Sequence, residues 1–243
     1  MSLPKLSAPL FEEVIPSTKQ AIRFRPFLVK EEKILLIAQS GGTKKEVINA
    51  IKQIINNCVV MQDGSSFDVG MLALFDLEYL FIKIRAKSVD NIVKLKYIDH
   101  EDEKTYEVEI NLDEIQVKFD ETNTNKIKVK DDIGIIMKYP TPEITNKIEF
   151  ESANKINEVQ FTQDLIKECI DKIYDADNVY VAKEIDPKEF DEFIDSMPIK
   201  ALEDIKKFFE TIPKITHTVE YTNSKGTKRE IELSSIDDFF TLQ

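Results

Sequence analysis

Residues 74–98, LFDLEYLFIKIRAKSVDNIVKLKYI, contain the change of hydrophobic period on which the fold prediction rests. From Val89 onwards apolar and polar residues alternate, as they do along a strand. Before that point Asp76 opens a helix, whose apolar residues recur at i, i+3, i+4 and i+7, namely Leu77, Leu80, Phe81 and Ile84. The segment therefore predicts a helix that leads directly into a β-rich region.

A hairpin and two helices are predicted before this segment. Residues 8–27 place β-rich runs on either side of Pro16-Ser17-Thr18-Lys19, a turn-forming cluster, which predicts the hairpin. A helix over Val29–Gln39 ends at Ser40-Gly41-Gly42, since glycine is common just beyond a helix C-terminus. Thr43-Lys44-Lys45-Glu46 is a capping box that begins a second helix, because the threonine hydroxyl accepts a hydrogen bond from the glutamate amide.

After residue 89 the sequence predicts strands first and helices later. Apolar residues from Leu165 to Ile173 form one helical stripe, and Asp186-Pro187 and Pro198 begin two further helices. Asn223-Ser224-Lys225-Gly226 is the turn of a terminal hairpin. The preceding strands are expected to form a small antiparallel sheet and comprise Ile92–Ile98, Tyr106–Ile110, Ile115–Phe119, Ile127–Val129 and Ile133–Tyr139.

These elements predict an α+β fold: an N-terminal hairpin and helices with a small antiparallel sheet, followed by a helical C-terminal part that ends in a β-hairpin. The polar stretch 143–157 is expected to be a connector. The prediction is therefore an N-terminal α+β domain at residues 1–142 and a helical domain with a terminal hairpin at residues 158–243.

The charge balance argues against two classes of partner. The 243 residues include 33 Lys and Arg against 45 Asp and Glu, which gives a formal charge of −12. Nucleic acids and anionic lipids both attract clustered Lys and Arg, so neither partner is expected. The apolar runs are far shorter than the roughly 20 residues that span a bilayer. The chain has two isolated cysteines, Cys58 and Cys169, and its N-terminus lacks the apolar core of a signal peptide. Both features indicate a protein of the reducing cytoplasm.

The sequence does not predict an enzyme, a cofactor or a metal site. The adjacent glycines of Ser40–Lys45 do not have the spacing of a phosphate loop. A calcium loop counted from Asp175 lacks the required glycine and glutamate. His100 and His217 belong to no ligand pair. A metal-dependent hydrolase with unrecognised ligands stays as an alternative, although no residue is assigned to catalysis.

Several ordered segments resemble the T4-like bacteriophage baseplate proteins. RFRPFLVKEEKILL at residues 23–36 is similar to the segment that opens the helical part in that family, and residues 74–89 are similar to its second signature. Asn111–Ile115, Met137–Thr141 and the terminal hairpin with Asp-Phe-Phe resemble further pieces in the same order. The resemblance covers most of the chain and is strongest over residues 20–140.

The resemblance implies a baseplate hub assembly factor that acts by protein–protein binding, without chemical catalysis. Its partners would be phage baseplate hub or tail proteins. It would be located in the host cytoplasm during assembly and could also be part of the virion tail. The alternative is a permanent structural component of the hub in the virion. Self-association stays open.

The expected partner surface consists of basic and aromatic residues that the two signatures and the chain end leave exposed. Positive residues at the end of a helix also complement its dipole. The basic residues could therefore have a purely structural role, and this alternative stays open. Ser88 could equally cap its own helix, and the terminal aromatics could pack on their own domain. The predicted partner-binding residues are Arg23, Arg25, Lys30, Arg85, Lys87, Ser88, Phe239 and Phe240.

Overall fold

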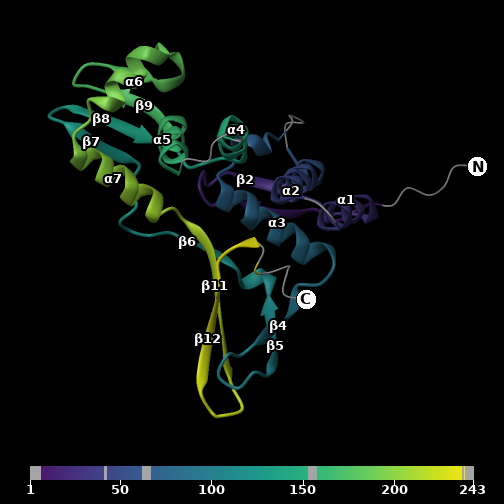
Figure 1. Ribbon diagram of the computed structural model, residues 1–243. Helices are drawn as coiled ribbons and strands as arrows, with labels where there is room; N and C mark the ends of the chain where they lie inside the picture. Colours follow the sequence, from purple (N-terminus) through teal and green to yellow (C-terminus); the bar gives the residue numbers. More distant parts are fainter. Residues whose placement is uncertain (1–6, 41–42, 62–66, 153–157, 237, 239–243) are drawn as a thin grey trace, which may run out of the picture. The chain divides into compact units, whose positions relative to one another are not determined.

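The computed structural model describes residues 7–40, 43–61, 67–152, 158–236 and 238 (Figure 1). These residues form seven α-helices and twelve strands in four sheets. The chain divides into two compact units: unit 1 comprises Met1–Lys118 and Lys214–Gln243, and unit 2 comprises Phe119–Pro213.

Unit 1 is organised around α3 (Leu74–Ser88), in which ten residues are buried. Helix α2 (Lys44–Cys58) packs on α3, and α1 (Val29–Gln39) packs on α2. The capping box of α2 is formed as predicted, since the Thr43 hydroxyl accepts a hydrogen bond from the Glu46 amide. The limits predicted for the first helix, Val29–Gln39, are those of α1.

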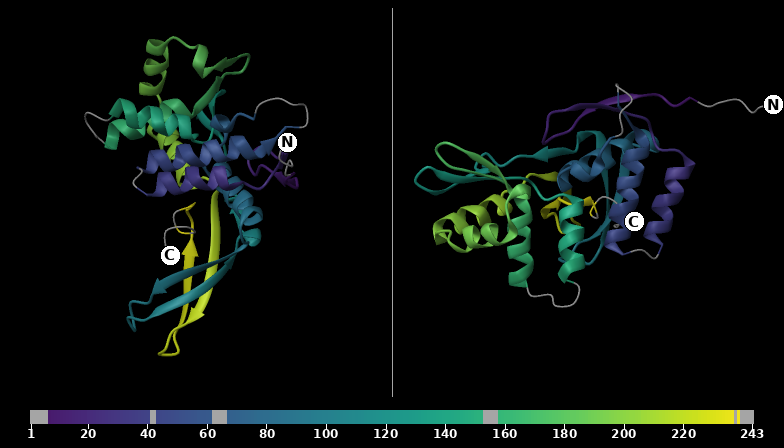
Figure 2. Two further views of the ribbon diagram at one scale, coloured as in Figure 1. Left: turned by 90° about the vertical axis from the view of Figure 1, so that its right-hand side faces the viewer. Right: turned by 90° about the horizontal axis from the view of Figure 1, so that it is seen from above.

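Three sheets complete unit 1. The first has the order β1-β2-β3, the second pairs β4 with β5, and the third has the order β12-β11-β6. Figures 1 and 2 show the β4–β5 and β11–β12 hairpins running side by side. The strands are β1 (Phe11–Val14), β2 (Ala21–Phe24), β3 (Val59–Val60), β4 (Ile92–Ile98), β5 (Thr105–Asn111), β6 (Gln116–Lys118), β11 (Lys214–Thr222) and β12 (Lys228–Leu233). Short 3-10 turns at η1 (Val69–Met71) and η2 (Leu112–Glu114) flank α3 and β5.

Unit 2 combines a four-stranded antiparallel sheet with four helices. The sheet order is β10-β9-β8-β7, and its apolar side chains share a core with α4, α5 and α7. The strands are β7 (Lys126–Lys130), β8 (Ile133–Met137), β9 (Ile170–Tyr174) and β10 (Val179–Val181). The helices are α4 (Pro142–Ser152), α5 (Glu158–Cys169), α6 (Pro187–Asp195) and α7 (Ile199–Glu210), with η3 (Ala182–Glu184) before α6.

The detailed fold description predicted from the sequence is wrong, although the protein does mix helices and antiparallel sheets. The later part of the chain is not mainly helical, because β9 and β10 extend the sheet that β7 and β8 begin. The terminal hairpin does not belong to the helical C-terminal part. It extends a sheet with an earlier strand, because β11 pairs with β6. The error has a physical source: Ile170 and Ile173 continue the apolar spacing of α5, yet the helix ends at Cys169 and the chain becomes extended.

The stretch 143–157 also differs from the expected connector. Helix α4 occupies residues up to Ser152, and it buries Ile144 and Ile148 in the core of unit 2. The two isoleucines lie four positions apart, so they share one face of the helix, and α4 packs on α5. The domain ranges 1–142 and 158–243 stay a prediction, and the two compact units have the limits given above.

A buried carboxylate fixes the N-terminal hairpin to α3. Asp76, in the first turn of α3, is fully buried. Its Oδ1 accepts a hydrogen bond from the Ser17 amide at 3.0 Å, and its Oδ2 accepts one from the Ser17 hydroxyl. Burial raises the pKa of Asp76, and the two hydrogen bonds from Ser17 oppose that shift. The turn between β1 and β2 is therefore held by the helix that it covers.

Replacing this carboxylate should destabilise the whole of unit 1. Asp76→Ala leaves both Ser17 donors without their acceptor, and we expect a loss of about 1–3 kcal/mol in the free energy of unfolding. Urea denaturation of Asp76→Ala, Ser17→Ala and the double variant measures the loss. The double variant should lose less than the sum of the single losses, since both remove one contact. Additive losses would contradict the assignment.

Candidate functional site

The two signature segments meet at one hollow on unit 1. This surface, here called the signature hollow, is formed by residues 7–9, 26–30, 32 and 87–89 and has a volume of about 880 Å³. Its lining includes the apolar side chains of Leu28, Val29 and Val89, which are 48%, 72% and 64% exposed. Exposed apolar groups gathered in a concave surface are typical of a binding site.

Ser88 holds the two halves of the hollow together. Its hydroxyl accepts a hydrogen bond from the Phe27 amide at 2.9 Å and donates one to the Ile84 carbonyl at 2.5 Å. The residue thus ends α3 and at the same time fixes the chain that enters α1. Its hydroxyl is used within the protein, although Ser88 also lines the hollow.

Arg25 stabilises the start of α1 beneath the hollow. Its Nη2 lies 2.9 Å from Oε1 of Glu31, whose side chain is fully buried. The other oxygen, Oε2, accepts a hydrogen bond from the Leu28 amide at 2.9 Å, which satisfies a free amide at the helix N-terminus. Burial alone would raise the pKa of Glu31, but the hydrogen bonds from Arg25 and Leu28 lower it overall. Arg25 is therefore occupied inside unit 1.

The other predicted partner residues are distributed over unit 1. Lys30 and Lys87 line the hollow; the Lys30 ammonium lies 3.3 Å from Glu31, and that of Lys87 lies 2.8 Å from Asp113. Arg23 forms an exposed ion pair with Glu12, 2.9 Å away on the neighbouring strand. Nη1 of Arg85 is buried and has no hydrogen-bond partner among the described residues. Phe239 and Phe240 lie outside the described residues.

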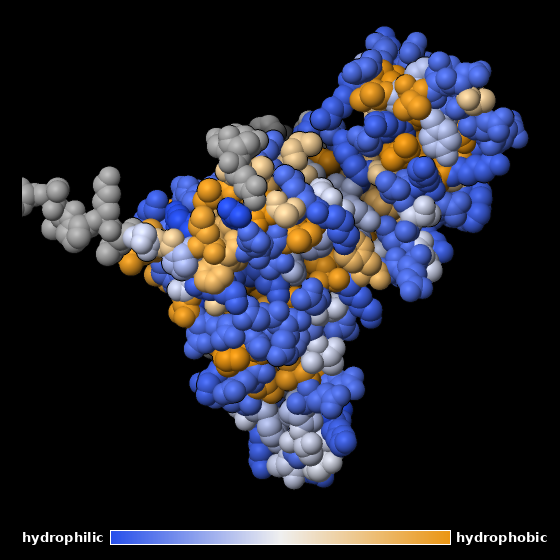
Figure 3. Space-filling model, turned by 180° about the vertical axis from the view of Figure 1, so that it is seen from behind, coloured by the Kyte–Doolittle hydropathy of each residue, from blue (hydrophilic) through white to orange (hydrophobic). Residues whose placement is uncertain are grey.

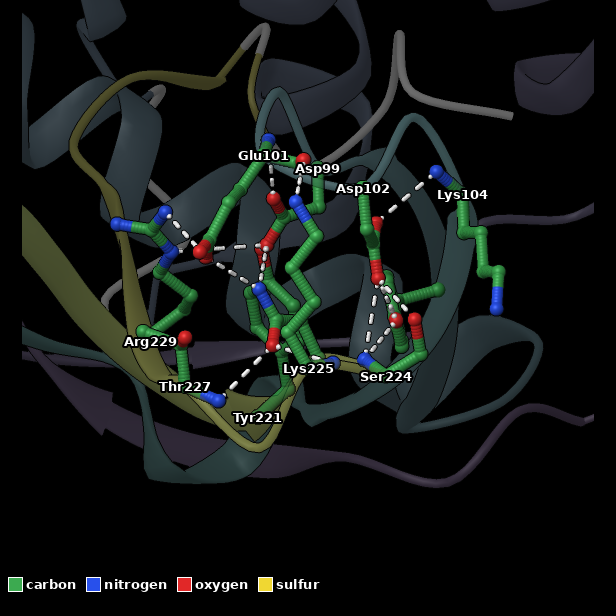
Figure 4. Close-up of polar contacts among 11 residues, drawn as sticks. Asp99, Glu101, Asp102, Lys104, Tyr221, Ser224, Lys225, Thr227 and Arg229 are labelled. Carbon is green, nitrogen blue, oxygen red and sulfur yellow. Dashed lines mark hydrogen bonds and ion pairs between the residues drawn. The ribbon is translucent and has the colours of Figure 1, made fainter.

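A cluster of polar residues joins the tips of the β4–β5 and β11–β12 hairpins. This cluster was not predicted from the sequence. This tip clasp consists of acidic residues in the β4–β5 turn, which accept hydrogen bonds from the β11–β12 hairpin (Figure 4). Asp99 accepts from the Tyr221 hydroxyl at 2.7 Å, and Glu101 accepts from the Asn223 amide nitrogen at 2.7 Å. Asp102 accepts from both the amide and the hydroxyl of Ser224, at 3.0 and 2.7 Å.

The clasp favours ionised carboxylates. The hydrogen bond from Tyr221 lowers the pKa of Asp99, and that from Asn223 lowers the pKa of Glu101. Burial would raise the pKa of Asp102, but hydrogen bonds from Tyr106 and Ser224 outweigh it and lower the pKa. Asp99 and Asn223 are almost fully buried, at 2% and 4% exposure. The signal in the sequence was an acidic turn and a donor-rich turn, but nothing showed that they pair.

Both cysteine thiols are buried and protonated. Burial raises the pKa of Cys58 to about 11 and that of Cys169 to about 12, so both stay protonated thiols at neutral pH. Within the described residues no cluster of His, Cys, Asp or Glu is arranged to hold a metal ion. No helix among the same described residues has the length and apolar character needed to cross a bilayer.

Comparison with known proteins identifies the family. The profile of the family described as T4 bacteriophage base plate protein matches residues 8–241. The chain belongs to this family. No curated protein and no solved structure gives a significant match. Membership in a base plate family implies contact with other phage baseplate or tail proteins, in a structural or assembly role.

The clasp should be sensitive to acid and to loss of Asn223. Because the three carboxylates have lowered pKa values in the folded protein, their stabilising effect is complete above the ordinary pKa of about 4 and is lost as the pH falls below it. Asn223→Ala removes the hydrogen bonds of this side chain to Glu101 and to the amides of Lys225 and Thr227, so the Ser224 amide beside it should exchange about tenfold faster or more already at pH 7.

Hydrogen exchange of the Ser224 amide, followed from pH 7 to pH 3, measures both effects after correction for the intrinsic rate. Asn178→Ala, in the exposed turn between β9 and β10, is the matched control and should leave the Ser224 amide unchanged. Equal protection in wild type and Asn223→Ala would show that the clasp does not hold the hairpin tips.

Proposed function

We propose that this protein is a baseplate hub assembly factor that acts by protein–protein binding, without chemical catalysis. One observation carries the proposal: the two segments that resemble the signatures of the baseplate family enclose one apolar hollow with exposed side chains. The match to the base plate family over residues 8–241 supports a partner from the phage tail.

The partner of the signature hollow would be another hub or tail protein with an apolar contact surface. Val29 is 72% exposed and lies beside Lys30, whose side chain is 66% exposed. An apolar centre with a charged rim is the usual anatomy of a protein interface. The formal charge of −12 would keep the factor soluble beside subunits with sticky surfaces.

The second candidate function is a permanent structural component of the hub in the virion. The family description, base plate protein, is compatible with this function as well as with an assembly factor. The two functions share the same docking surface and differ in whether the protein stays in the particle. The host cytoplasm is the place proposed for assembly in both cases.

A charge in the signature hollow should abolish docking without unfolding the protein. Val29→Asp places a carboxylate in the apolar contact. Binding then loses the apolar contact of the valine and must also desolvate the new charge, which is the larger cost in free energy. In cells infected with phage that lack the gene, we expect Val29→Asp to reduce complementation about tenfold or more, because losing a central contact costs about 2 kcal/mol or more of binding free energy.

Ile199→Asp is the matched control, because Ile199 is equally exposed, at 78%, and lies in unit 2. It should complement as the wild type does. Circular dichroism of both variants verifies that each is folded. Full complementation by folded Val29→Asp would exclude the signature hollow as the docking surface.

Quantitative mass spectrometry of purified particles and infected-cell lysates distinguishes the two functions. For an assembly factor we expect the chain to be abundant in lysate and absent from particles. A fixed ratio to other baseplate proteins in the particle would instead establish a structural component.

A further inference from the structure

Unit 2 contains an open hollow of about 520 Å³ beside the β9–β10 hairpin, η3 and α6. We refer to it as the acidic hollow. Its apolar lining is accessible, since Ile133, Val179 and Tyr180 are 38%, 63% and 45% exposed. Figure 3 shows exposed apolar side chains set among hydrophilic ones on this unit. The hollow has the size of a site for one or two side chains of a partner.

Helix α6 is covered incompletely at this position. The helix is strongly amphipathic, yet none of its residues is fully buried. Phe190 and Phe193 line the hollow and remain only partly buried against the core of unit 2. An apolar helix stripe normally packs against another element. Part of the stripe of α6 is therefore available to a partner.

The rim of the hollow carries one sign of charge. Four carboxylates line it, from Asp175, Glu184, Asp186 and Glu189, and the described lining contains no Lys or Arg. Glu184 and Glu189 are exposed and form no ion pair within the described part of the chain. The nearest lysines along the chain, Lys183 and Lys188, do not belong to the lining.

Two of the carboxylates are held in place by backbone amides. Asp175 accepts hydrogen bonds from the amides of Asp177 and Asn178 at 2.9 and 2.8 Å, which lower its pKa. Asp186 caps α6 by accepting from the Lys188 amide at 2.9 Å. These negative charges are thus fixed at the edge of an apolar surface, while those of Glu184 and Glu189 stay free to pair.

We propose that the acidic hollow binds a segment of another protein in which an apolar side chain is flanked by Lys or Arg. The apolar side chain would cover Val179 and Phe193, and the basic residues would pair with Glu184 and Glu189. Complementary charges around an apolar anchor give orientation and selectivity to such a contact. The inference is independent of the proposed function, which concerns a hollow in unit 1.

A second copy of this chain is a poorer occupant. Its best basic and aromatic segment is Arg23-Phe24-Arg25-Pro26-Phe27. Phe24 and Phe27 are buried in unit 1, at 2% and 5% exposure, and Arg25 pairs with Glu31. That segment could not leave its place without unfolding unit 1. The exposed pair Val29 and Lys30 is the better segment of a second copy, but the Lys30 ammonium already lies 3.3 Å from Glu31, so the occupant that we propose is a different protein.

The test is selection of random dodecapeptides displayed on phage against the full chain, followed by fluorescence titration of the enriched peptides. We expect the enriched sequences to combine Lys or Arg with an aromatic or aliphatic residue. Glu184→Lys/Glu189→Lys should weaken their binding about tenfold or more, since attraction becomes repulsion. Higher salt should weaken binding to the wild type, because the rim charges are exposed.

Glu203→Lys/Glu210→Lys is the matched control, with the same change of charge at two exposed positions of α7 outside the hollow. It should bind the peptides as the wild type does. Val179→Ser tests the apolar contact separately and should weaken binding while the rim stays intact. Circular dichroism verifies that all variants are folded.

Four results would overturn the inference. The first is no enrichment of peptides, and the second is enriched peptides without basic residues. The third is equal binding of the peptides by Glu184→Lys/Glu189→Lys and by the control Glu203→Lys/Glu210→Lys. The fourth is self-association of the full chain that Glu184→Lys/Glu189→Lys weakens, which would identify a second copy as the occupant.

Discussion

The burial of α3 is the constraint on which unit 1 depends. Ten of its residues are removed from solvent, including one acid and one base, so the helix must be covered on nearly every side. Asp76 binds the β1–β2 turn, and Lys83 donates to the carbonyls of Leu112 and Asp113 at 3.4 and 2.6 Å. Burial lowers the pKa of Lys83, and the carbonyls compensate for lost water. Each of these two buried polar side chains thus binds one neighbouring segment.

The elements set by local interactions could be predicted, and those set by distant pairing could not. The capping box of α2 and the turn at Asn223 to Gly226 depend on residues a few positions apart. By contrast, β11 pairs with β6 through Lys214 and Lys118, and β8 pairs with β9 across two intervening helices. The boundary at Cys169 was missed because the apolar spacing suits a helix and a buried strand equally well over five residues.

The candidate site shows the same division. Basic residues could be recognised in the sequence, but their partners could not. Arg25 reaches Glu31 only because the chain turns between them to begin α1, and this ion pair removes the arginine from the surface. Ser88 serves as a helix end and as a link to Phe27, a double role that its position in the chain did not reveal. Lys30 keeps an exposed side chain, since it follows the turn.

The two hollows show that the net charge of −12 is a poor guide to what this protein can bind. The signature hollow carries Lys30 and Lys87 beside one glutamate, whereas the described lining of the acidic hollow has carboxylates alone. At physiological salt a charge acts over about 8 Å, so each surface responds to its own rim rather than to the whole molecule. Such differences allow a protein to discriminate between partners, because apolar surfaces without distinct rims would not.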